Sequence, residues 1–122
     1  MQKVIDFIKN NMPFFVGTIN EDAPAIRPFG AIMLYQGDLY ITTGVGRTCY
    51  YQMINGAKVQ LLSMKHGTRE WLRVNCIAQE ETSVKLKELA IKENPVLENI
   101  YAGATDPTFA LIKLKVLDYE FK

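Results

Sequence analysis

The sequence predicts one mainly β domain in which antiparallel strands form a barrel, with helices at the gaps of the barrel. Most segments of the 122-residue chain alternate between apolar and polar residues with the period of a strand, and short turns join them. Helical spacing occurs only at the start, once near the middle and once in the second half. A parallel sheet needs a helical crossover between successive strands, and these helical segments are too few for that. The length suits a single domain over residues 1–122.

The first half of the chain predicts one helix and then a set of strands. Apolar residues at helical spacing begin at Val4, so a short helix should end near Asn11. The run over residues 25–35 alternates like a strand. Within it, Pro28 and Gly30 indicate a bulge or an edge position, because proline cannot donate to a neighbouring strand. The other strands expected in this half are residues 14–19 and 39–43, with turns at 20–22 and 36–38.

The second half predicts two helices and three strands. The first helix covers residues 48–55, with Thr48 as its N-terminal cap. The second begins at Ser83 and ends before Pro95, because proline does not continue a helix. Strands are expected at residues 59–64, 70–79 and 109–116.

Composition excludes several classes of protein. The net charge is +1, so no overall field favours nucleic acid or an anionic membrane surface. The two cysteines, Cys49 and Cys76, are too few for a disulfide framework and have no metal-binding spacing. The first residues lack the apolar run of a signal peptide, and no stretch approaches the roughly 18 apolar residues of a membrane span. We therefore expect a cytoplasmic protein.

Arg27 lies on a predicted strand face whose other members are apolar. Those neighbours are Phe29, Ala31 and Met33. An unpaired charge buried among them would be costly, so two interpretations stay open. Arg27 either extends to solvent or pairs with a carboxylate such as Glu21, or its guanidinium binds an anion such as phosphate.

The segment from Thr42 to Thr48 joins a strand to a predicted helix and reads TTGVGRT. Hydroxyls, two glycines and Arg47 before a helix suit an anion, through free backbone N–H groups and the helix dipole. The spacing differs from that of a Walker loop. Such turns are also rich in glycine and threonine for conformational reasons alone. Together with Arg27, however, the segment offers two arginines and several hydroxyls to one phosphate.

Trp71 is the only tryptophan and lies opposite the apolar stripe that begins at Leu72. A tryptophan that faces away from the core is typical of an interface or a ligand site, although a barrel strand can bury both faces. Arg73 shares its face. The sequence shows no nucleophile–base pair and no metal-binding cluster, so it identifies no catalytic residue.

The order of these segments resembles the pyridoxamine 5'-phosphate oxidase-like, FMN-binding split-barrel family. It is similar in particular to the short bacterial members that include nitroimidazole-resistance proteins. The matching pieces are the first strand and turn, RPFG after it, YxTT at the end of the next hairpin, a basic residue before Tyr-x-Gln-x-x-Asn reading from Tyr50, and WLRV from Trp71. No piece is specific alone, but the ordered set spans residues 14–74 and the likeness extends to the segment before Pro95.

The resemblance implies a six-stranded antiparallel split β-barrel that forms a homodimer, with FMN bound between the subunits. It also implies a small-molecule substrate, with NADH or NADPH as electron donor, and no metal. Arginine and threonine positions would face the phosphate, the RPFG strand would lie against the flavin ring, and Trp71 with its neighbour would reach the flavin from the other subunit or nearby. The cofactor-binding residues it implies are Arg27, Pro28, Phe29, Gly30, Thr42, Thr43, Arg47, Thr48, Gln52, Glu70 and Trp71.

Several positions depart from the family pattern. Ala25 stands where short members often have a second basic residue, and Thr48 stands where the oxidase proper has a basic residue. Asn75 and Cys76 follow WLRV where a glycine is common, and the C-terminal segment that binds substrate in the oxidase is not present. These departures speak against pyridoxamine phosphate oxidation.

The function predicted from the sequence is therefore an FMN-dependent oxidoreductase of unassigned substrate. The alternatives are a non-catalytic flavin-binding or redox-sensing protein, a haem- or deazaflavin-binding relative on the same fold, and a plain dimeric interaction module.

Overall fold

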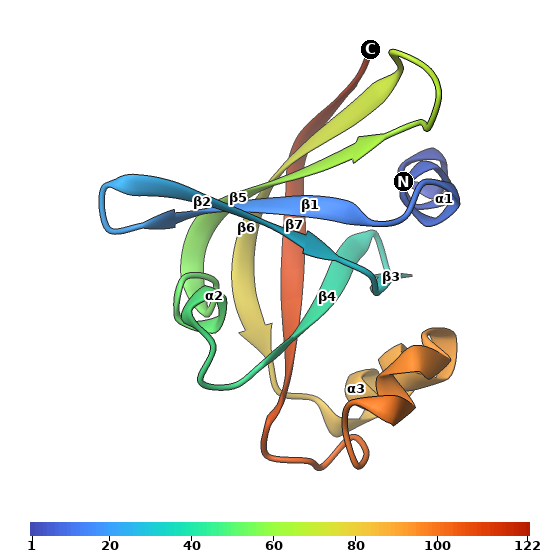
Figure 1. Ribbon diagram of the computed structural model, residues 1–122. Helices are drawn as coiled ribbons and strands as arrows, with labels where there is room; N and C mark the ends of the chain where they lie inside the picture. Colours follow the sequence, from blue (N-terminus) through green and yellow to red (C-terminus); the bar gives the residue numbers. More distant parts are fainter.

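The computed structural model describes residues 1–122 and shows a mainly β fold with flanking helices (Figure 1). The strands are antiparallel and form one sheet in the order β2-β1-β5-β6-β7-β4-β3. The helices are α1 (Gln2–Asn10), α2 (Thr48–Tyr51), α3 (Val84–Glu93) and the 3-10 helix η1 (Pro95–Asn99). The strands are β1 (Phe14–Asn20), β2 (Ala23–Phe29), β3 (Ile32–Tyr35), β4 (Asp38–Gly44), β5 (Asn55–Met64), β6 (Trp71–Glu81) and β7 (Phe109–Phe121).

The sheet has seven strands where six were predicted, because the run over residues 25–35 is two strands. The chain leaves the sheet at Gly30 and Ala31, and β2 and β3 then occupy the two opposite edges of the sheet. The edge position predicted from Pro28 is confirmed, since β2 pairs with β1 alone. The barrel is therefore not closed. We call the place where the β2 edge faces the end of β4 the seam.

The core fills the inward faces of the strands. Alternate residues of β6 from Leu72 to Ala78 are fully buried, as their shared face predicted. Val4 and Ile8 of α1 join the same cluster, so the helical spacing at the start of the chain serves to cover the barrel. Burial raises the pKa of Cys76 to about 12, which makes this thiol an inert core residue.

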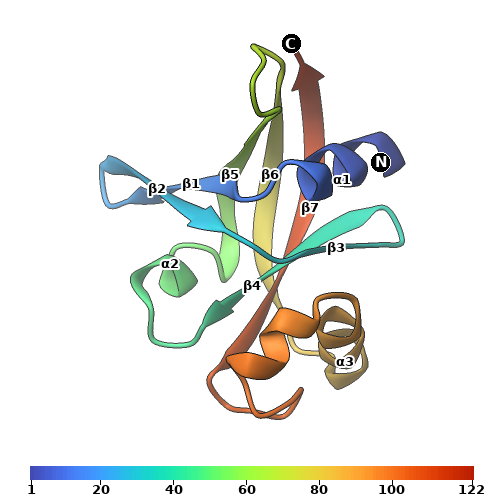
Figure 2. The ribbon, with the colours of Figure 1, turned by 45° about the vertical axis from the view of Figure 1, so that its right-hand side comes forward.

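A layer of helix covers the side of β4 and β7 that faces away from the barrel interior (Figure 2). Ala90 of α3 packs on Tyr40 and Leu111, and α3 begins at Ser83 as predicted, because the Ser83 hydroxyl accepts a hydrogen bond from the Leu86 N–H. Asn94 ends α3 and holds it to the sheet. Its amide pairs with both backbone groups of Ile32 at the start of β3, at 3.2 and 3.4 Å.

The helix predicted over residues 48–55 is much shorter in the structure. It ends at Tyr51, and β5 already begins at Asn55. Arg47, not Thr48, is the residue before its first turn, and no side chain caps it. The reason is tertiary: the backbone of residues 55–64 pairs with β6, which outweighs the local preference for helix.

No helix of the structure has the length and apolar character needed to cross a membrane.

Candidate functional site

A cavity of about 360 Å³ lies at the seam, which is within the size range of small-molecule sites. The end of β2 forms one wall, the end of β4 with the following turn forms a second, and η1 with the residues after it forms a third. The lining residues are Arg27, Pro28, Phe29, Gly30, Ala31, Thr42, Thr43, Gly44, Arg47, Cys49, Val96, Leu97, Ile100 and Tyr101. The structure therefore brings together seven of the eleven predicted site residues.

The cavity is positively charged. Arg27 and Arg47 both line it, and none of the lining residues is a carboxylate. Neither arginine takes part in any of the ion pairs of the structure, so the pairing of Arg27 with Glu21 that the sequence left open does not occur. Two guanidinium groups without counter-charges beside a cavity favour an anionic ligand.

Arg27 is half-buried and held by weak contacts only. Its Nη1 lies 3.3 Å from the Thr18 Oγ1 and 3.5 Å from the Gln52 Oε1, and the Thr18 hydroxyl also donates to that Gln52 oxygen. The Gln52 Nε2 is buried and has no hydrogen-bond partner. Gln52 thus lies behind Arg27, not on the cavity surface, and keeps an unused donor beside it.

The turn after β4 differs from the predicted anion cradle. The Val45 N–H donates to the Thr108 carbonyl at 2.8 Å and the Arg47 N–H donates to the Gly44 carbonyl at 3.2 Å, so these two groups are not free. With only four residues, α2 also offers little helix dipole. Two of the predicted backbone donors are therefore used within the protein, and no such bond involves the N–H groups of Gly46 and Thr48. The turn also offers the Arg47 side chain with the hydroxyl of Thr42, while Thr48 is exposed and outside the cavity lining.

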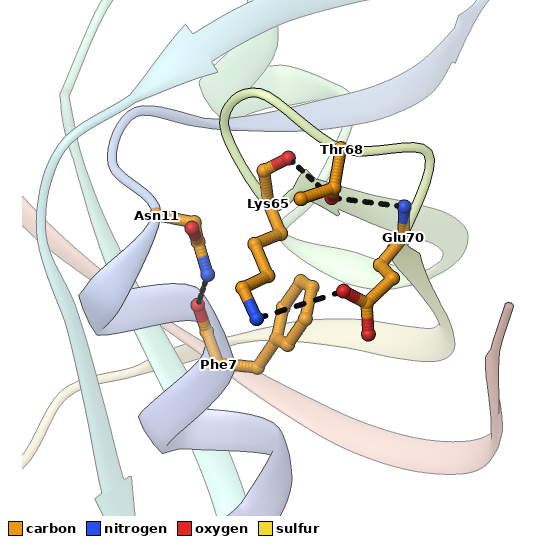
Figure 3. Close-up of polar contacts among 5 residues, drawn as sticks. All are labelled: Phe7, Asn11, Lys65, Thr68 and Glu70. Carbon is orange, nitrogen blue, oxygen red and sulfur yellow. Dashed lines mark hydrogen bonds and ion pairs between the residues drawn. The ribbon is translucent and has the colours of Figure 1, made fainter.

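Glu70 and Trp71 lie far from this cavity within one chain. Both are at the turn between β5 and β6, near the C-terminus, while α2 and the seam lie toward the other end of the molecule (Figure 1). The Glu70 carboxylate forms an ion pair of 3.5 Å with Lys65, and its N–H donates to the Thr68 hydroxyl, close to the end of α1 (Figure 3). Trp71 is half-buried, and the Arg73 guanidinium lies 5.4 Å from its ring centroid.

Sequence reasoning missed the third wall of the cavity. Val96, Leu97, Ile100 and Tyr101 come from η1 and the residues after it, for which no strand or helix was predicted. A signal was present, because the apolar residues after Pro95 recur at i and i+4, which is typical of a helical turn with one apolar side. In the structure Val96 and Ile100 are 52% and 63% exposed. Only the fold brings this segment beside the arginines.

Known proteins with a similar structure define the fold class of this chain. No protein-family model matches the chain, and no curated protein matches its sequence. Among solved structures, a general stress FMN/FAD binding protein from Xanthomonas citri has a TM-score of 0.80 at 18% identity, over 99% of this chain and 86% of that one. A Clostridium acetobutylicum protein of the pyridoxinephosphate oxidase family, related to general stress protein 26, has a TM-score of 0.81 at 14% identity, over 99% and 86%. The fold is thus the pyridoxamine 5'-phosphate oxidase-like split barrel.

One relative is similar enough to give the family. A NimC/NimA family protein from Clostridium acetobutylicum has a TM-score of 0.86 and 32% sequence identity, over 93% of this chain and 81% of that one. The chain belongs to the NimC/NimA family, and the likeness to nitroimidazole-resistance proteins predicted from the sequence is confirmed.

Proposed function

We propose that the chain is an FMN-binding flavoprotein that acts as an oxidoreductase on a small molecule. The observation that carries this proposal is the seam cavity, which combines two arginines without counter-charges, the Thr42 hydroxyl and apolar walls, and which has no carboxylate. A phosphate on a flat apolar ring system has matching chemistry. The solved relative from Xanthomonas citri is described as FMN/FAD binding, which supports the same assignment.

Each part of the cavity suits a different part of the cofactor. Arg27, Arg47 and the Thr42 hydroxyl would hold the phosphate. The backbone from Phe29 onward leaves the sheet at the seam and would lie along the ring. When bound, the flavin supplies electron transfer, and the protein supplies binding and orientation. NADH or NADPH is the proposed electron donor.

We further propose that the chain works as a homodimer, with the partner on the outward face of β1, β2 and β5. No helix covers this face, and it exposes several large apolar side chains, of which Ile26 is 72% exposed. An apolar surface of this kind indicates a protein interface. We call it the outer face and define it by Phe15, Ile19, Ile26, Leu62 and Met64.

The outer face connects the cavity with Trp71. Pro28 lines the cavity and pairs across the strands with Phe15, which pairs with Leu62. Met64, two residues farther along β5, pairs with Trp71. The outer face therefore runs from the cavity to the tryptophan of the same chain, and a partner seated on it with two-fold symmetry would place its own Trp71 toward this cavity. This supports a role of Trp71 and Glu70 at the flavin of the partner, since they are remote within one chain.

The proposed function is tested by flavin binding. The purified chain, as isolated or after addition of FMN, should show the absorption bands of oxidised protein-bound flavin and quench FMN fluorescence. NADH or NADPH under anaerobic conditions should then bleach these bands, and an added acceptor such as a quinone should restore them. A chain that binds no FMN, or that shows a Soret band as isolated, contradicts the proposal. A bound flavin that no donor reduces would support a carrier instead of an enzyme.

Leu62→Glu should dissociate the dimer. The new carboxylate would be buried against an apolar partner surface in the dimer, while in the free monomer this exposed position leaves it in solvent. We expect the dimer dissociation constant to rise at least 100-fold, on the order of a 3 kcal/mol penalty for an uncompensated charge at an interface. Sedimentation equilibrium measures this.

Val84→Glu is the matched control for the dimer. It places the same charge at an exposed valine of α3, away from the outer face. Its dissociation constant should equal that of the wild type. A wild-type chain that is monomeric at micromolar concentration, or a Leu62→Glu variant that stays dimeric, would show that the outer face is not the interface.

A further inference from the structure

Tyr101 stands in the third wall of the seam cavity, opposite the residues that the sequence singled out. It lines the same cavity as Arg27 and Arg47, and it is half-buried. Its hydroxyl forms no hydrogen bond with the protein, whereas its ring stacks on Phe109 and its backbone N–H is bonded. A phenol held at a positively charged cavity with an unused O–H is suited to donate to an anion.

The ring of Tyr101 is held rigidly. It stacks on Phe109 with 4.7 Å between the ring centroids and 18° between the planes, and Phe109 is itself buried. Lys87 of α3 also holds Phe109 in place. Its ammonium group donates to the Phe109 carbonyl at 3.2 Å and lies 5.7 Å from the centroid of the Phe109 ring. The Tyr101 N–H donates to the Leu97 carbonyl at 2.9 Å. The side chain therefore needs little reorganisation to bind.

The backbone around Tyr101 is also fixed, and it is joined to the turn that carries Arg47. The Asp106 carboxylate accepts hydrogen bonds from the Ala102 N–H and from the N–H and hydroxyl of Thr108, all within 2.9 Å. These bonds lower the pKa of Asp106, first through the Ala102 N–H. The Thr108 carbonyl then accepts the Val45 N–H, two residues from Arg47.

The charge of Arg47 reaches the phenol. Burial raises the pKa of Tyr101, while Arg47 acts in the opposite direction and Asp106 in the same direction. The phenol is thus protonated at neutral pH. Because Tyr101 and Arg47 line the same cavity, the hydroxyl can donate a hydrogen bond to an anion that Arg47 binds.

We propose that the Tyr101 hydroxyl donates a hydrogen bond to the phosphate of the bound flavin and makes the site selective for FMN over riboflavin. The inference rests on the proposed function and adds a residue from a segment that neither the motifs nor the resemblance pointed to. Tyr101 is a binding residue in this role, not a member of the reacting groups.

Tyr101→Phe tests the proposal because it removes the hydroxyl and keeps the stacked ring. We expect the dissociation constant for FMN to rise about tenfold, as for the loss of one hydrogen bond to a charged group, and that for riboflavin to stay unchanged. Titration calorimetry or flavin fluorescence quenching measures both ligands. Tyr119→Phe is the matched control, since Tyr119 is exposed on β7 outside the cavity, and both of its dissociation constants should equal those of the wild type.

The outcomes separate this inference from the proposed function. If FMN binding depends on Arg27 and Tyr101→Phe leaves it unchanged, only the role of Tyr101 is wrong. An equal loss of affinity for FMN and riboflavin would assign Tyr101 to the apolar wall and also overturn the inference. If the wild-type chain binds neither ligand, the proposed function and this inference both fail. Thermal unfolding of Tyr101→Phe at the wild-type temperature shows that the fold is intact.

Discussion

Replacing Arg27 and Arg47 together with alanine is expected to lower the affinity for FMN between about 100-fold and 10,000-fold. Each charge-assisted hydrogen bond to a phosphate contributes about 1.5–3 kcal/mol, and 1.4 kcal/mol is a factor of ten in affinity. Two such donors therefore dominate the binding of the phosphate end. Because no carboxylate pairs with either arginine, their loss leaves no unpaired buried anion, and the fold should survive.

The measurement is FMN titration of the double variant and of each single variant. The matched control is Lys3→Ala with Lys9→Ala, which removes the same charge from exposed positions on α1. The control should bind FMN within about twofold of the wild type, since exposed charges far from a site are largely screened. A double arginine variant that binds FMN within about threefold of the wild type would show that the phosphate site lies elsewhere, because two lost charge-assisted bonds must exceed that change.

Phe14→Ala is expected to have the largest effect on stability. Phe14 is fully buried at the start of β1, and its ring centroid lies 6.0 Å from that of Phe29, which lines the seam cavity. Truncating a buried phenylalanine costs about 3–5 kcal/mol, against a total stability of about 5–15 kcal/mol for a domain of ordinary size. The variant should therefore be marginally folded at 37 °C, and Phe29 should lose the packing that places it.

Denaturant unfolding measures this loss as a lower midpoint with an unchanged slope. Phe14→Leu is the graded control, because it keeps most of the buried volume and should lose clearly less stability than the alanine variant. Equal midpoints for Phe14→Ala and the wild type would contradict the assignment of Phe14 to the core. A changed slope would instead indicate that the variant alters the denatured state or no longer unfolds in two states.

The elements that were predicted well are those with strong local signals. Alternation in β6 identified its buried face, the Ser83 cap located the start of α3, and Pro28 indicated an edge strand. The element predicted least well was α2. Residues 52–55 have acceptable helical sequence, but pairing of β5 with β6 starts at Asn55, and strand pairing decides the local structure there.

The sequence predicted several side chains of the candidate site better than it predicted the backbone donors. Arg27 and the Thr42–Arg47 turn were singled out from the sequence because charged and hydroxyl residues stand out among apolar strands, and the structure places them in one cavity. The predicted cradle of free backbone N–H groups is smaller than expected, because the Val45 and Arg47 N–H groups are bonded within the protein. A backbone donor has no signature in the sequence, so its availability depends on contacts that only the folded chain makes.

By itself, the sequence determined the class of fold, most strands and helices, and the residues with the chemistry to bind a phosphate. Periodicity and charge are properties of a short segment, and they carry this information without tertiary contacts. Only the tertiary structure decided that one long run becomes the two edge strands β2 and β3, which leaves the barrel open at the seam. It also decided that η1 and Tyr101 complete the cavity, and that Trp71 is remote from it within one chain. These facts depend on which distant segments meet, and that is set by long-range strand pairing and burial.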